Sequence, residues 1–201
     1  MTAPQPLVID LTEHWSVIKH FANETRLGGK SCVHADQKIR SERLWRDQLV
    51  GHSGEAALHL YTHGSIEGYI KNRTERGKSP WTGDGGTDMP GAKVDIKCSY
   101  LPPGKDPGGF TLFVRDREFH ENTVYYMGMM TCIRSPFQVY VTLAGWIPGE
   151  EYLAMSEQYD FNGDLVAGVP VTKLYRVVPI RWSGVTYMDL PKTHLSKGVL
   201  V

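Results

Sequence analysis

The spacing of apolar residues changes along this chain, from a helical period before residue 64 to a strand period after residue 93. The early spacing predicts three helices, over residues 10–22, 35–50 and 53–63. Residues 94–98 read Val-Asp-Ile-Lys-Cys, and this alternation of apolar and polar side chains is typical of a half-exposed strand. Helices followed by strands favour an α/β fold, in which a mixed central β-sheet is flanked by helices.

The second half of the chain continues in strand period, with one late helix. We expect further strands at residues 110–115, 124–130, 137–147 and 174–180. Pro148 favours a helix that reaches residue 159, because proline fits the first turn of a helix, and residues 161–168 predict a turn. We divide the chain into a helical segment that packs on a core, the core itself and a C-terminal tail: residues 1–52, 53–181 and 182–201.

Charge and cysteine usage limit the partners and the environment of the protein. The 22 basic and 22 acidic residues balance, which excludes a strongly basic coat but not a local basic patch. Three widely spaced cysteines without a CxxC pair indicate free thiols in a reducing compartment. The first ten residues lack signal-peptide features, and no apolar run approaches the roughly 20 residues of a membrane span. We therefore expect a cytoplasmic protein without a membrane partner.

Two aspartates and a lysine are predicted to converge near the first strand. Asp88 precedes a tight turn at Pro90-Gly91, and a hairpin there would bring Asp88 back beside Asp95. Asp95 and Lys97 share one face of the strand because side chains alternate. Two carboxylates and a backbone carbonyl are hard oxygen ligands that suit Mg²⁺, while an ammonium group stabilises charge that develops on a phosphodiester. A third acid is expected from a neighbouring element, and Glu55 is the best candidate.

The pattern Asp88…Asp95-x-Lys97, with Glu55 in a Gly-Glu-x-Ala sequence upstream, resembles the PD-(D/E)XK signature of the restriction-endonuclease-like nucleases. Thr87 stands where that signature has a proline. The likeness covers residues 53–180 as an order of elements, and it implies a restriction-endonuclease-like core with an N-terminal helical extension. The residues that the resemblance assigns to the metal are Glu55, Asp88, Asp95 and, through its carbonyl, Ile96.

The resemblance implies a Mg²⁺-dependent DNA nuclease, an endonuclease in our interpretation, that hydrolyses phosphodiester bonds with a metal-activated water. Mn²⁺ is the expected substitute for Mg²⁺. The implied catalytic residues are Glu55, Asp88, Asp95 and Lys97. Single-site nucleases of this type often pair to cut both strands, so a homodimer is consistent with the resemblance. A basic run precedes the acidic turn, and its predicted phosphate-binding residues are Lys71, Arg73, Arg76 and Lys78.

Other functions stay open from the sequence. One alternative is a catalytically inactive nucleic-acid-binding or structural protein on the same fold. Another is a zinc hydrolase, because Glu55, His59 and His63 have the i, i+4, i+8 spacing of one helix face, although no HExxH sequence is present. A group of aromatic residues favours core and sheet surface over a base-stacking function: Tyr125, Tyr126, Tyr140 and Trp146.

Overall fold

The computed structural model describes residues 7–28, 41–76, 93–114, 119, 125–134, 138–161, 164–177 and 187–188. The helices are α1 (Trp15–Gly28), α2 (Ser41–His63), α3 (Glu67–Arg76) and α4 (Gly149–Met155). The strands are β1 (Leu7–Asp10), β2 (Val94–Tyr100), β3 (Thr111–Phe113), β4 (Tyr125–Arg134), β5 (Gln138–Pro148), β6 (Glu157–Phe161), β7 (Asp164–Pro170) and β8 (Tyr187–Met188). Three short 3-10 turns are η1 (Thr12–His14), η4 (Pro107–Gly109) and η6 (Val171–Lys173).

The central sheet has five strands in the order β2-β4-β5-β1-β8. Strand β2 pairs with β4 in parallel, while the β4–β5, β5–β1 and β1–β8 pairs are antiparallel. The sheet is therefore mixed, as expected. Because β2 has β4 as its single neighbour in that order, β2 forms an edge of the sheet within the described part of the chain.

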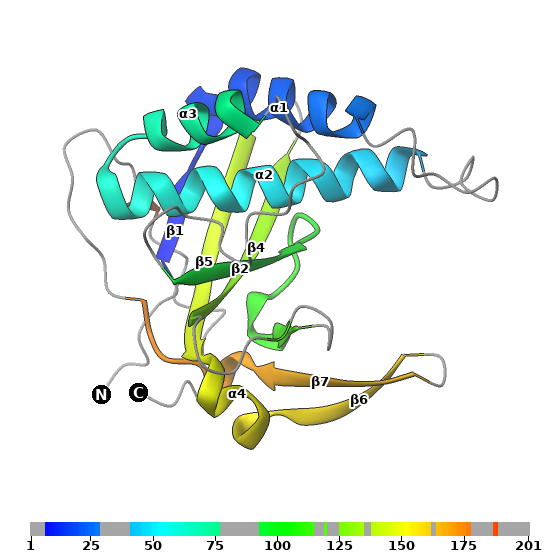
Figure 1. Ribbon diagram of the computed structural model, residues 1–201. Helices are drawn as coiled ribbons and strands as arrows, with labels where there is room; N and C mark the ends of the chain where they lie inside the picture. Colours follow the sequence, from blue (N-terminus) through cyan, green and yellow to red (C-terminus); the bar gives the residue numbers. More distant parts are fainter. Residues whose placement is uncertain are drawn as a thin grey trace.

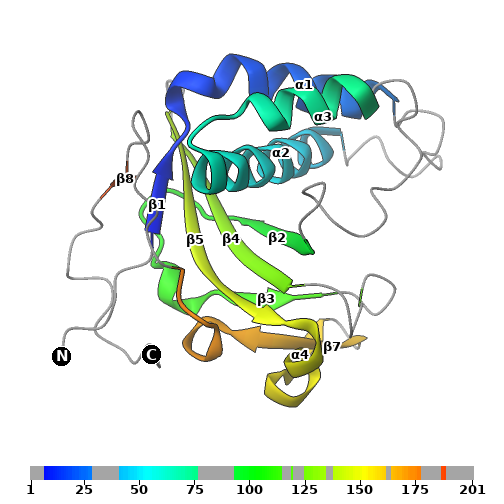
Figure 2. The ribbon, with the colours of Figure 1, turned by 60° about the vertical axis from the view of Figure 1, so that its left-hand side comes forward.

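Helix α2 crosses one face of the central sheet, and α1 and α3 lie over α2 on the side away from the strands (Figures 1 and 2). A close approach at Gly54 sets the contact between α2 and β2. A methyl group at Gly54 would lie 3.1 Å from Cys98 Sγ and 3.4 Å from Ile96 Cγ2. The side chains of β2 that face α2 are therefore Ile96 and Cys98, and both belong to or pack against the larger hydrophobic core.

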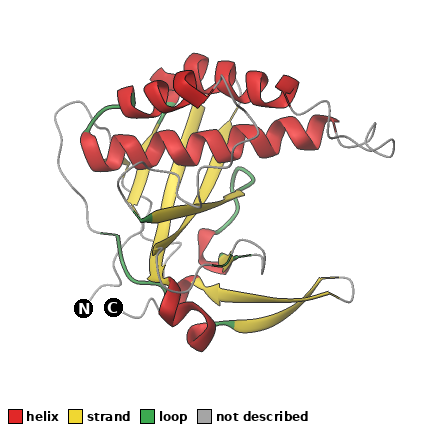
Figure 3. Ribbon diagram, viewed as in Figure 1, coloured by secondary structure: helices red, strands yellow, loops and turns green. Residues whose placement is uncertain are grey.

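A second layer covers the other face of the central sheet. The small sheet, β3-β7-β6, lies below the central strands together with α4, as the yellow strands of Figure 3 make clear. Its core is a separate cluster of buried apolar side chains: Leu112, Val114, Tyr126, Ile147, Tyr152, Val169 and Leu174. The architecture is thus a mixed α/β fold with helices on one face of the central sheet. None of the described helices is both long and apolar enough to cross a membrane.

Several predicted elements differ in the structure. Residues 7–10 form β1 in the central sheet, and Asp10 Oδ1 accepts a hydrogen bond from Thr12 N at the start of η1, so a helix does not begin at residue 10. The predicted break at Gly51 is wrong, because α2 is continuous from Ser41 to His63. A Cβ at Gly51 would have nothing within 4 Å, so no neighbouring atom requires a glycine at this position, and the helix passes through it. The domain boundary placed after residue 52 falls inside this helix.

The C-terminal part is richer in strands than predicted. The late helix ends at Met155, and the antiparallel pair β6–β7 occupies residues 157–161 and 164–170, a part of the chain expected to hold a helix end and a turn. Residues 171–177 hold η6 and an isolated bridge from Tyr175 to Trp146 instead of the start of a strand. Helix α3 occupies residues 67–76, where no helix was predicted.

Tyr152 anchors α4 to the β3 end and to β7 of the small sheet. Its hydroxyl accepts a hydrogen bond from Val114 N at 2.9 Å and donates to Ala167 O at 2.8 Å. Because Tyr152 is buried, we expect Tyr152→Phe, which removes these hydrogen bonds, to lower the free energy of unfolding by about 1–3 kcal/mol in urea denaturation. The same change at the half-buried Tyr159 is the control and should cost much less; equal losses at both positions would contradict this interpretation.

Candidate functional site

Strand β2 holds two of the predicted site residues together. Lys97 Nζ lies 3.0 Å from Asp95 Oδ2, and the two side chains are 20% and 11% exposed. The prediction of a strand at residues 94–98 with both side chains on one face is confirmed. An ion pair this sheltered keeps a carboxylate and an ammonium group in fixed positions, because neither can relax into bulk water.

The Asp95–Lys97 pair and helix α2 lie on different sides of β2. Ile96 and Cys98 face Gly54 of α2, so the alternation of the strand directs Asp95 and Lys97 to the opposite face. The register agrees, because Asp95 pairs with Tyr126, whose side chain belongs to the second core cluster.

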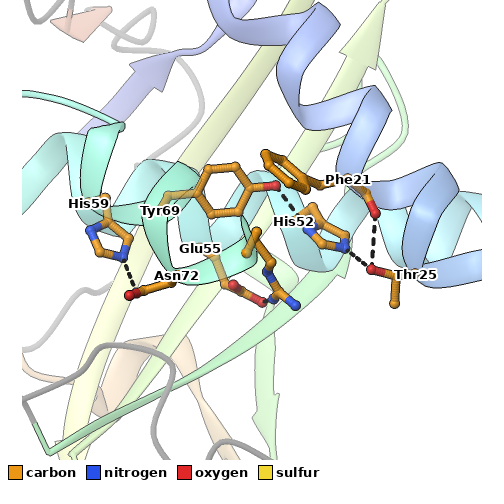
Figure 4. A network of polar contacts seen from close by, with 8 residues as sticks. Phe21, Thr25, His52, Glu55, His59, Tyr69 and Asn72 are labelled. Carbon is orange, nitrogen blue, oxygen red and sulfur yellow. Dashed lines mark hydrogen bonds and ion pairs between the residues drawn. The ribbon is translucent and has the colours of Figure 1, made fainter. Parts of the chain in front are cut away.

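Glu55 engages a different partner from the one predicted. Its carboxylate Oε1 forms an ion pair with the guanidinium Nη2 of Arg73 from α3, and the two side chains are 14% and 18% exposed (Figure 4). Arg73, predicted to bind phosphate from an exposed loop, thus lies mostly buried on a helix. The described contacts of Glu55 link α2 to α3, and none of them joins Glu55 to Asp95.

A buried hydrogen-bond chain next to this ion pair connects α1, α2 and α3 (Figure 4). Thr25 Oγ1 donates to Phe21 O at 2.9 Å and lies 2.9 Å from His52 Nε2. Since the one hydroxyl proton of Thr25 is used, His52 Nε2–H donates to Thr25, and His52 Nδ1 accepts from Tyr69 OH at 2.9 Å. His52 is therefore neutral, with its proton on Nε2.

Burial of this network changes the acidity of its members. Desolvation, and secondly the positive charge of Arg73, lower the pKa of His52 from 6.5 to about 3. Desolvation also raises the pKa of Tyr69 above its ordinary value. The sequence analysis did not identify these residues, although His52 falls at helical spacing between Leu49 and Ala56, both buried, and that position was a usable signal.

His59 and His63 do not complete a zinc site with Glu55. The two imidazoles are stacked with ring centroids 5.8 Å apart, and His59 Nε2 lies 3.4 Å from Asn72 Nδ2. Within the described residues, no three His, Cys, Asp or Glu side chains form a group that could hold a metal ion. The three-ligand geometry that a zinc hydrolase requires is therefore not formed by this helix face.

The remaining predicted site residues lie either on α3 or outside the described residues. Lys71 is exposed and lies 4.0 Å from Glu75 in an i, i+4 pair on α3. Arg76 ends α3. Asp88 and Lys78 lie outside the described residues, as does the predicted turn at Pro90-Gly91.

The donors on β2 suit one class of cation. The Asp95 carboxylate and the backbone carbonyl of Ile96 are hard oxygen ligands. Mg²⁺ binds proteins through one or two carboxylates while keeping several waters, so it does not need a complete protein cage. The Asp95 carboxylate fits this pattern better than the pattern of a zinc or calcium site. Comparisons with family models, with curated proteins and with solved structures found no match to this chain.

Removal of Arg73 is expected to act on stability. Arg73→Ala leaves the mostly buried Glu55 carboxylate without its guanidinium, which should lower the free energy of unfolding by about 2–3 kcal/mol. Lys71→Ala, on the exposed side of the same helix, should change it by under about 0.5 kcal/mol. Urea denaturation of both variants measures the difference. An unchanged free energy of unfolding for Arg73→Ala would show that the ion pair contributes nothing to the packing of α3 on α2.

Proposed function

We propose that this protein is a Mg²⁺-dependent deoxyribonuclease with a restriction-endonuclease-like core. The observation that carries the proposal is the sheltered Asp95–Lys97 pair on β2, with Nζ and Oδ2 3.0 Å apart. A carboxylate and an ammonium group two residues apart on one strand face match the second half of the signature that the sequence resembles. The order of α2 with Glu55, β2, the β4–β5 pair and α4 supports the same assignment.

Asp95 and Lys97 have complementary roles in this reaction. Asp95, with Asp88, would hold the cation, and when bound the cation supplies positive charge against the phosphate and lowers the pKa of water. Lys97 directs its ammonium group to the space beside Asp95, where it orients the attacking water and balances negative charge on the phosphate. Water attacks phosphorus and the bond to the 3′-oxygen breaks, which leaves a 5′-phosphate and a 3′-hydroxyl.

Glu55 takes a structural position in this proposal. Its carboxylate is held by Arg73 on the α2 side of β2, and α2 contacts β2 through the preceding residue, Gly54. Because Asp95 and Lys97 lie on the opposite face of β2, Glu55 would join α3 to α2 and would not be a ligand of the cation. The Arg73 guanidinium fixes the direction of the Glu55 carboxylate.

One comparison tests the proposal directly. The purified protein is incubated with circular duplex, linear duplex, single-stranded DNA and RNA, each with Mg²⁺ and with EDTA. We expect cleavage of a DNA substrate that requires Mg²⁺ and is retained with Mn²⁺, and products that carry 5′-phosphates. Absence of cleavage on all four substrates with either ion would overturn the proposal.

A further inference from the structure

Three aromatic rings form a ladder at the end of β5 that runs into α4. The ring centroids of Tyr125 and Trp146 lie 5.7 Å apart, and those of Trp146 and Tyr175 lie 4.9 Å apart. Tyr125 is 48% exposed and Tyr175 is 43% exposed, which is unusual for large aromatic side chains in a sheet. We call Tyr125, Trp146 and Tyr175 the aromatic ladder.

The ladder is held in place by the backbone. Trp146 and Tyr175 exchange two hydrogen bonds, with N–O distances of 2.9 and 2.8 Å, and Trp146 Nε1 donates to Arg176 O at 3.1 Å. Tyr175 OH donates to Glu151 Oε2 at 2.7 Å. Gly145 permits the close approach, because a methyl group there would lie 2.8 Å from Tyr175 O and its φ of +156° favours glycine. Rings fixed in this way lose little conformational entropy when they bind a ligand.

The ladder lies beside the strand that carries the candidate site, on the opposite face of the sheet. Tyr125 pairs with Val94 in the β4–β2 register, and Val94 immediately precedes Asp95. Neighbouring strands lie about 4.8 Å apart, so the backbones of Tyr125 and Val94 are one strand spacing from each other, while Asp95 shares the other face with Tyr126. Two exposed cations flank the ladder along the chain: Lys93, whose O accepts a hydrogen bond from Tyr125 N, and Arg176, which follows Tyr175.

We propose that the aromatic ladder binds unpaired bases of a nucleic-acid strand whose backbone passes between Lys93 and Arg176. Every base has a π-face that stacks on an aromatic ring, and phosphates are drawn to the two cations, so rings and charges together match a single strand. A base pair inside a duplex presents no such free face. This inference deepens the proposed nuclease function and rests on it: the ladder would hold single-stranded or frayed DNA beside β2, the edge strand that carries Asp95.

Binding measurements without metal test the ladder separately from cleavage. Fluorescence anisotropy in EDTA follows a labelled oligothymidylate and a blunt duplex of equal length. We expect Tyr125→Ala and Tyr175→Ala each to weaken binding of the single strand by about tenfold or more, and to leave binding of the duplex within about twofold. Tyr125→Phe keeps the ring and should bind like the unaltered protein.

The controls separate the outcomes. Leu165→Ala removes a large side chain that is 71% exposed on β7, away from the ladder, and should not change binding. Unchanged single-strand binding in both alanine variants, or an equal loss for the duplex, would overturn the ladder even if Mg²⁺-dependent cleavage is found. If cleavage is absent but the single strand depends on both tyrosines, the ladder stands and the nuclease proposal fails. Circular dichroism confirms folding, and leucine at the same position, Tyr125→Leu or Tyr175→Leu, replaces an alanine variant that does not fold.

Discussion

Lys97→Ala should lower the rate of Mg²⁺-dependent DNA cleavage by at least about a hundredfold, the usual cost of removing one charge-stabilising group from a hydrolytic site. The physical reason is the position of the ammonium group, 3.0 Å from Asp95 Oδ2 and mostly sheltered from water. In such a site water cannot replace the lost positive charge at low cost. Single-turnover cleavage of a labelled substrate measures the effect on the chemical step.

A matched lysine separates chemistry from general charge. Lys93 is exposed and directly precedes β2. Lys93→Ala therefore removes one positive charge close to the same strand but leaves the Asp95–Lys97 ion pair intact. We expect Lys93→Ala to weaken DNA binding, most strongly at low salt, and to keep the cleavage rate of bound substrate. Lys97→Met, which keeps the apolar stem, controls for packing and should be as inactive as Lys97→Ala. Equal cleavage by Lys97→Met and the unaltered protein would exclude Lys97 from the reaction.

The local part of the site could be predicted from sequence because it depends on strand alternation alone. Asp95 and Lys97 stand two residues apart, and any strand at this place puts them on one face. The position of Glu55 depends on tertiary packing, since Arg73 comes from α3, a helix that polar and turn-forming residues concealed. The spacing of the motif therefore identified the Asp95–Lys97 pair on β2, but it could not predict that Glu55 would pair with the Arg73 side chain.

Non-local pairing explains the elements that were missed. Strand β1 has four residues, too few for a periodic signal, and it exists because it pairs with β5 more than a hundred residues later. In α2, the residues on both sides of Gly51 are buried against the rest of the protein. This packing outweighs the roughly 1 kcal/mol by which one glycine disfavours a helix. Tertiary contacts decided both cases, and the sequence window around each residue does not contain them.

The same packing makes the protein sensitive to acid. We expect the free energy of unfolding to fall as the pH drops from about 6.5 towards 3, by up to about 1.4 kcal/mol per pH unit. Over this interval the unfolded chain binds a proton at His52, while the folded chain keeps His52 neutral because its pKa is lowered to about 3. Above pH 6.5 neither state binds this proton, so His52 adds no slope there. Urea denaturation at closely spaced pH values gives the curve.

A non-titrating side chain identifies the source of that slope. His52→Gln can accept from Tyr69 and donate to Thr25 as the imidazole does, but it binds no proton, so its stability should fall less steeply between pH 6 and 4 by up to about 1.4 kcal/mol per pH unit. His63→Gln, a change at an exposed histidine on the same helix, is the control variant. Parallel curves for His52→Gln and the unaltered protein would mean that His52 is not held neutral. The hydrogen-bond chain from Thr25 through His52 to Tyr69 would then not be the link between α1, α2 and α3.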